Sequence, residues 1–302
     1  MGESRETYVP NVLLLGNGIN RAFGDMSWGS VIDGLSTGEF DYNQKWMEKI
    51  KTIPFSLQTI VISSDSVSDG MKNLSKKLMP STLEEKHANL LKDLISLPFD
   101  AFLTTNYSYE IETAIDPCFM LRAGHASKYR HKTQKGTGPQ EQFGIFTYLS
   151  VEEHNIWHIH GEAARHNSMV MGHYYYGKLL GEIQKRVPDL IRKYKALYNK
   201  GVDFKPQSWI DYFLLGNIYI VGFGMDPSEM DIWWLINCKK RDFPQSGKVY
   251  LFEPNLGKEE RFAVKALCET FNISYSEVSA KGAKQYIQFY EKTTNEIKKL
   301  IH

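Results

Sequence analysis

The sequence predicts an α/β fold: a mostly parallel, Rossmann-like sheet with helices on both faces and a helical insert module. Three observations predict it. Short continuous apolar runs recur along the chain, as in strands that are buried on both faces. Segments with helical spacing lie between these runs, so strands and helices alternate. Two of the runs end in Gly-x-Gly, a turn that commonly follows a strand in nucleotide-binding sheets.

Five apolar runs are predicted to be core strands. The first is Val12-Leu13-Leu14-Leu15, which ends at Gly16. Four more runs have the same apolar character, and a weaker sixth follows them near the end of the chain. They cover residues 101–105, 155–160, 217–221 and 248–252, with the weaker run at 273–278.

Three segments have the apolar spacing of helices. Residues 83–97 place leucines and Ile95 at helix-face intervals, and residues 178–200 form a basic amphipathic stretch. Pro188 lies within the second segment and is expected to start a new helix or to kink the first one. The last segment, from Lys281, is expected to be an amphipathic terminal helix.

These elements are expected to form one domain, 1–302. Its Rossmann-like core covers about 8–24, 99–111 and 154–280, and the terminal helix covers about 281–302. The gap at about 25–98, which contains Trp28 and Trp46, is too long for a single crossover, so we expect a helical insert there, and we expect a second helical insert at about 112–153. Residues 132–142, rich in lysine, glycine and glutamine, are expected to form a loop.

Composition excludes several classes of protein. The 36 basic and 35 acidic residues nearly cancel, unlike the charge of a dedicated nucleic-acid binder. The polar N-terminus does not resemble a secretory signal, and no apolar run approaches the ~20 residues of a spanning helix, so a cytoplasmic location without membrane contact is expected. Cys118, Cys238 and Cys268 form no CxxC pair, so they indicate buried small hydrophobes rather than disulfides or a zinc site.

Two segments after predicted strands are candidate ligand-binding turns. Gly16-Asn17-Gly18-Ile19-Asn20 starts like a phosphate-binding turn, although Arg21 stands where the dinucleotide fingerprint has its third glycine. Thr104-Thr105-Asn106-Tyr107-Ser108 ends the second strand, where open parallel sheets bind ligands. Either segment could instead be structural, as a glycine turn or as the cap of the next helix.

The segment His158-Ile159-His160-Gly161 admits three interpretations. The two histidines point to the same side of a strand, which would suit a metal pair, although no further ligand cluster stands out. They could also be a structural pair. In the third interpretation His160, at the strand end, is a general base whose pKa lies near the working pH.

Two later segments could serve the other half of a nucleotide. Gly222-Phe223-Gly224 follows a strand, and Asp226-Pro227-x-Glu229 then has the pattern of an N-cap, a first-turn proline and a capping-box acid, which is the role expected for both acids. Glu253 and Asn255 follow the last core strand, where an acid could bind ribose hydroxyls or simply be solvated.

Taken in order and spacing, these segments resemble the sirtuin-type NAD-binding family across roughly residues 11–256. The likeness is greatest to SIR2-like effectors of bacterial anti-phage defence, which hydrolyse NAD when infection is sensed. The resemblance implies a sirtuin-type fold, NAD as substrate and no metal. The residues that carry it lie in the strand–glycine turn, the Thr-Thr-Asn segment, the Ile-His-Gly segment and the second glycine turn.

The resemblance also implies roles for individual residues. Asn106 and His160 would be catalytic. The pyrophosphate and nicotinamide side would be lined by Gly16, Asn17, Gly18 and Asn20, and Thr105 and Ser108 would also bind the cofactor. The adenosine half would contact Gly222, Phe223 and Gly224, with Glu253 or Asn255 near its ribose.

Three departures from that family keep other functions open. The four-cysteine zinc module of protein deacylases is absent, their Phe-Arg segment is not recognisable, and Ser108 stands where the family has an acid. A non-catalytic NAD or ADP-ribose-binding subunit, a deacylase or ADP-ribosyltransferase, and a metal-dependent phosphoesterase are the alternatives. The resemblance further implies an activating step, through a homo-oligomer or a complex with a sensor subunit.

Overall fold

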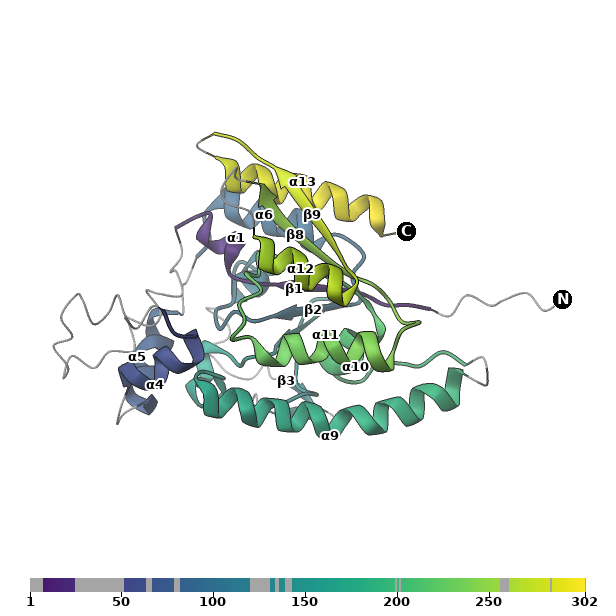
Figure 1. The fold of residues 1–302 in the computed structure, drawn as a ribbon. Coiled ribbons are helices and arrows are strands. Elements are labelled where there is room, and N and C mark those ends of the chain that lie inside the picture. The colour runs from purple at the N-terminus through teal and green to yellow at the C-terminus, as the bar shows by residue number, and fades with distance from the viewer. Residues whose placement is uncertain are drawn as a thin grey trace.

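A computed structural model of the chain describes residues 8–24, 52–63, 67–78, 82–119, 131–133, 136–138, 143–198, 200, 202–255, 261–282 and 284–301. Within these residues a central sheet lies between two layers of helices, as predicted (Figure 1). No helix of the described part is both long and apolar enough to cross a membrane.

The central sheet has seven strands in the order β5-β6-β2-β1-β7-β8-β9. All pairs are parallel except the one between the edge strand β5 and β6. Each of the six apolar runs forms a strand, as predicted. They are β1 (Asn11–Leu15), β2 (Ala101–Thr104), β6 (His154–His158), β7 (Asn217–Val221), β8 (Val249–Asn255) and β9 (Ile273–Ser279). The short β5 (Leu149–Val151) was not predicted.

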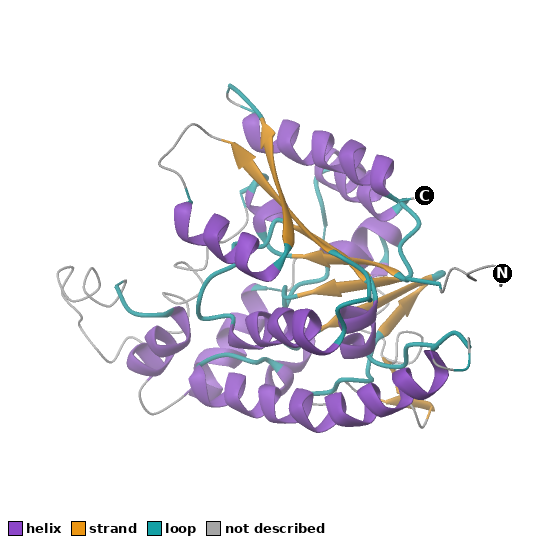
Figure 2. Ribbon diagram, turned by 45° about the vertical axis from the view of Figure 1, so that its right-hand side comes forward, coloured by secondary structure: helices purple, strands orange, loops and turns teal. Residues whose placement is uncertain are grey.

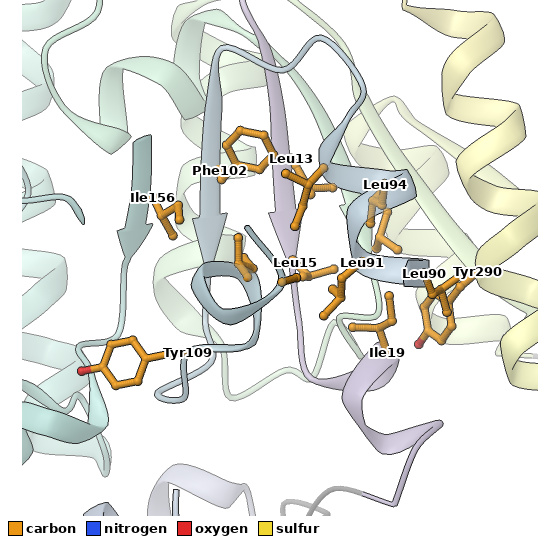
Figure 3. Packing of buried hydrophobic residues seen from close by; sticks show 14 of the residues in the cluster. Leu13, Leu15, Ile19, Leu90, Leu91, Leu94, Phe102, Tyr109, Ile156 and Tyr290 are labelled. Atoms are coloured by element: carbon orange, nitrogen blue, oxygen red, sulfur yellow. The ribbon is translucent and has the colours of Figure 1, made fainter. Parts of the chain in front are cut away.

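The alternating side chains of the strands divide the core into two halves. Leu13 and Leu15 of β1 face one half, whereas Val12 and Leu14 face the other. The first half is covered by α1 (Gly18–Arg21), α6 (Glu85–Ile95), α7 (Glu110–Ile115) and α13 (Gln285–Leu300). Figure 3 shows Leu90, Leu91 and Leu94 of α6 packed over Leu13 and Leu15.

The second half of the core is covered by α9 (His173–Tyr198), α10 (Trp209–Leu215), α11 (Met230–Asp242) and α12 (Phe262–Phe271). In Figure 2 the strands, in orange, lie between the two groups of helices. Pro188 lies within α9 without ending it, so neither a new helix nor a break begins there; the helix forgoes only one backbone hydrogen bond at that position.

The insert regions differ in part from the prediction. The helices α4 (Phe55–Ser63) and α5 (Val67–Lys77) agree with a helical insert, while Trp28 and Trp46 lie outside the described residues. The segment 132–142, expected to be a loop, contributes to a two-stranded antiparallel ladder of β3 (His131–Thr133) and β4 (Gly136–Gly138). A 3-10 helix, η1 (Ala163–Ser168), follows β6.

The cysteines agree only partly with the expectation of burial. Cys238 and Cys268 are buried, but Cys118 is exposed in the turn that follows α7. Pro117 and Cys118 lie on the outer side of this turn, while the neighbouring Phe119 is buried.

The order of the strands creates a switch point at β1. The chain leaves β1 for β2 and β6 on one side, then crosses to β7, β8 and β9 on the other side. Open α/β sheets bind ligands outside the carboxyl ends of the strands at such a point. The fold therefore predicts a ligand-binding site beside the residues that follow β1 and β7.

Candidate functional site

The two glycine turns meet at the switch point. The Gly16 N–H donates a hydrogen bond to the Val221 carbonyl at 2.9 Å, and the Gly18 N–H donates to the Gly222 carbonyl at 2.7 Å. A Cβ atom added at Gly16 would lie 2.6 Å from the Gly222 oxygen and 2.6 Å from the Phe223 Cα. Backbone thus packs directly on backbone, a contact that only glycine at position 16 allows.

A cavity of about 500 Å³ opens beside these turns. This size lies within the usual range of small-molecule sites, about 300–1,000 Å³. Most of the site residues expected from the sequence line it: Asn17, Gly18, Thr105, Asn106, Ser108, His160, Gly222, Phe223, Gly224 and Glu253. Gly16, Asn20 and Asn255 lie outside its wall. The cavity brings together residues from the ends of five strands, β1, β2, β6, β7 and β8.

Asn106 is held by its backbone at the end of β2. Its N–H donates to the Thr104 hydroxyl at 3.0 Å, and that hydroxyl donates to the Leu15 carbonyl at 2.9 Å. The Asn106 carbonyl accepts a hydrogen bond of 2.8 Å from Nδ1 of His158. Because its backbone is anchored on both sides, the Asn106 side chain starts from a fixed position on the cavity wall.

His158 is itself held in a buried ion pair. Its Nε2 atom lies 2.8 Å from Oε1 of Glu112 on α7, and both side chains are almost fully buried. Burial alone would lower the pKa of His158, but the Glu112 carboxylate outweighs it and raises that pKa to about 9. At neutral pH His158 is therefore a cation with both ring nitrogens engaged, which suits the structural interpretation of this residue.

His160 lies at the turn after β6 and has a different set of partners. Gly161 follows with a φ of +87°, and its missing side chain leaves room for the Ser168 carbonyl. The ring Nε2 lies 2.9 Å from Oδ2 of the buried Asp231, and Nδ1 lies 3.9 Å from Oε2 of Glu229. Burial lowers the pKa of His160, but the Asp231 carboxylate and then Glu229 raise it above its ordinary value.

One comparison with known proteins bears on this geometry. Residues 100–213 match the family model of the SIR2-like domain. This part of the chain is therefore similar to SIR2-like domains. The match begins at β2, ends in α10 and includes both Asn106 and His160. No curated protein matches the chain.

SIR2-like domains bind NAD, so the match points to an NAD-related activity for the cavity. The first glycine turn, the second glycine turn and Glu253 lie outside the matched residues. Their place around the same cavity comes from the structure alone. The expectation of a SIR2-like, Rossmann-like fold is thereby confirmed.

Glu253 lines the cavity at β8, which lies on the other side of β1 from β6 and His160. It is buried at the end of β8, where it accepts a hydrogen bond of 3.2 Å from Tyr275 and pairs with Arg261. Arg261 also donates to the Gly224 carbonyl, which ties this end to the second glycine turn. Asn255, two residues on, is exposed and donates instead to Glu277 at 3.4 Å.

Asn20 is buried beneath the first glycine turn and holds it by hydrogen bonds. Its side-chain amide donates to Oδ1 of Asn17 at 2.8 Å, and its oxygen lies 3.0 Å from Nε2 of His87. Asn20 is 1% exposed and Asn17 lines the cavity. Asn20 therefore acts on the cavity through Asn17, which it holds in place.

The acids of the second glycine turn differ from the predicted capping pattern. The helix α11 begins at Met230, not at Pro227, and no side chain caps its N-terminus. Asp226 instead accepts hydrogen bonds from the backbone N–H and hydroxyl of Ser228, and Glu229 reaches Tyr176 at 3.0 Å. Met225 has a φ of +50°, so the chain bends before the helix starts, and the expected capping positions fall in a turn.

Sequence reasoning missed Asp231, Glu229 and Tyr176 as site residues. Together with His160, the two acids form a group whose donor atoms lie within 4.8 Å of one another, close enough to hold a metal ion. At 2.9 Å, however, the His160–Asp231 contact has the length of a hydrogen bond, whereas two ligands of one zinc ion stand about 3.3 Å apart. We therefore interpret the group as a histidine oriented by one carboxylate and faced by another.

Proposed function

We propose that the protein is an NAD hydrolase that cleaves the nicotinamide–ribose bond and releases nicotinamide and ADP-ribose. The observation that supports this most is the single cavity shared by the two glycine turns, Asn106 and His160 at the switch point of a SIR2-like domain. A dinucleotide needs a long cavity with a polar backbone near its centre, and these turns stand between Glu253 at one end and His160 at the other.

The chemistry follows from the charge of the substrate. Nicotinamide leaves as a neutral base, and an oxocarbenium-like ribose remains, as in glycoside hydrolysis. In this proposal Asn106 orients the ribose hydroxyls and the water. His160, whose Nε2 is engaged by Asp231, presents Nδ1 to the cavity and takes up a proton from a ribose hydroxyl. General base catalysis of this kind increases the reaction rate by roughly 10²–10⁴-fold.

We further propose that the enzyme is a cytoplasmic, NAD-depleting effector of anti-phage defence. Such an enzyme must be inactive at rest, so an activating partner or a homo-oligomer belongs to the proposal. The support for this role is the resemblance of the ordered segments to SIR2-like defence effectors. Expression together with the products of neighbouring genes, followed by measurement of NAD during phage infection, tests it.

Ser108 favours a second candidate, a subunit that binds NAD or ADP-ribose without cleaving it. It is buried on the cavity wall, where the resemblance leads one to expect an acid. A wall without that carboxylate can still bind a dinucleotide. Tight NAD binding with less than one turnover per protein would favour this candidate over the hydrolase.

The test is incubation of the purified protein, alone and with its partners, with NAD and quantification of nicotinamide and ADP-ribose by chromatography. Asn106→Ala and His160→Ala should each abolish turnover while the fold and NAD binding persist. The exposed Asn167→Ala and the partly exposed His166→Ala are matched controls. An unchanged rate in Asn106→Ala or His160→Ala removes that residue from its role, and a chelator that stops turnover points to a metal.

A further inference from the structure

Glu229 places a carboxylate in the cavity beside His160. It lies directly before α11, at the carboxyl end of the β7 segment, and its side chain is 18% exposed where it lines the cavity. Tyr176 of α9 donates its hydroxyl to Oε2 of Glu229 at 3.0 Å. Burial raises the pKa of that phenol well above its usual value, so it remains a proton donor. The carboxylate is thus fixed in direction, and among the described residues its ion-pair contact is with His160, at 3.9 Å.

The gap between Glu229 and His160 has the size of a bound water. Oε2 of Glu229 lies 3.9 Å from Nδ1 of His160, too far for a direct hydrogen bond. One water with bonds of about 2.8 Å to both atoms spans this distance at an angle of roughly 90°. Nδ1 can hold that water in either state of the ring, as an acceptor when neutral and as a donor when charged, because Asp231 occupies Nε2.

The surroundings also favour proton uptake by Glu229. Burial raises the pKa of its carboxyl above the ordinary value, and Asp231 adds to the rise, whereas His160 opposes it. A carboxylate of raised pKa is a stronger base near neutral pH than an exposed one. Asp231 cannot share this task, since it is fully buried and faces the other side of the imidazole.

We propose that Glu229 is the general base that activates the attacking water, which it holds together with Nδ1 of His160. The inference rests on the proposed NAD hydrolase function. Glu229 would supply a carboxylate to the site, where the segment after Asn106 has Ser108 in place of the family's acid. The water oxygen bonds to C1′ of the ribose while the C1′–N bond breaks and its electron pair stays on nicotinamide. The water proton passes to Glu229 and is later released to solvent.

The test uses Glu229→Gln, which keeps the shape of the side chain but cannot take up a proton. Nicotinamide release should fall at least 100-fold, whereas NAD affinity measured by calorimetry should change less than 3-fold. Sodium azide, an anionic nucleophile with no proton to remove, should restore nicotinamide release at least 10-fold and give ADP-ribosyl azide by mass spectrometry. Glu229→Asp, which retains a carboxylate, should lie between the wild type and Glu229→Gln.

The control is Glu182→Gln on the outer surface of α9, which removes a carboxylate far from the chemistry and should leave the rate unchanged. Hydrolysis by Glu229→Gln at the wild-type rate overturns the proposal, and so does a loss that azide cannot restore in a folded variant. Should Glu229→Gln not fold, a reduced rate in Glu229→Asp that azide restores supports the role of Glu229 as the base, and a wild-type rate in Glu229→Asp counts against it. A loss in Glu229→Asp that azide cannot restore overturns it. A wild-type protein that binds NAD but releases no nicotinamide, even together with its partners, overturns the hydrolase function itself.

Discussion

The buried pair of His158 and Glu112 gives the protein a pH-dependent stability that Glu112→Gln should remove. Burial opposes the charge on His158, but Glu112 raises its pKa from 6.5 to about 9 in the folded state. A histidine whose pKa is raised by folding stabilises the protein fully below pH 6.5, and this stabilisation is lost as the pH rises through 9. The size of the rise corresponds to a loss on the order of 3 kcal/mol.

Urea denaturation at pH 6 and pH 10 measures this effect as a difference between proteins. In Glu112→Gln the buried His158 loses its partner and its pKa falls, so the decrease in unfolding free energy between the two pH values should be smaller by about 3 kcal/mol. The exposed Glu153→Gln is the control and should keep the wild-type pH dependence. Equal pH dependences of wild type and Glu112→Gln would refute the assignment of the charge to His158.

Two further predictions concern the cavity. Asp231→Asn removes the negative charge that faces Nε2 of His160. It should lower kcat for nicotinamide release by about 10²–10⁴-fold with little change in NAD affinity. A change in KM alone would contradict the positioning role, and the exposed Asp203→Asn should behave as wild type. Gly18→Ala places a Cβ atom 2.7 Å from the Gly222 carbonyl oxygen. This substitution should lower the free energy of unfolding by about 1–3 kcal/mol, measured by thermal denaturation, and should weaken NAD binding. Gly181→Ala is the control, because its Cβ meets nothing within 4 Å. Unaltered NAD binding by Gly18→Ala would show that the two turns need not touch.

The strands could be predicted because their signal is local. A run such as residues 12–15 is apolar at every position, which only a strand covered on both faces requires. β5 carries one polar residue between two apolar ones in three positions, too short a pattern to distinguish from a loop. Its place at the edge depends on pairing with β6, which no local pattern shows.

The site residues that directly follow a strand could be predicted from the sequence. Asn106, His160 and the glycine turns follow strands directly, so the parallel sheet alone brings them to one edge. Glu229 and Asp231 could not be assigned in this way, since their roles depend on where α11 begins. The pattern Asp226-Pro227 favours an early start, but the turn at Met225 delays it and turns both acids toward His160.

The contact between the two glycine turns has a consequence for biosynthesis. Gly16 emerges early from the ribosome, yet its partners at Val221 and Gly222 are made some two hundred residues later. Non-local pairing of this kind forms only after the intervening chain is available. A nascent or prematurely terminated chain that stops before β7 therefore carries Asn106 and His160 but has no complete pocket, so the proposed reaction has to wait for the second half of the chain.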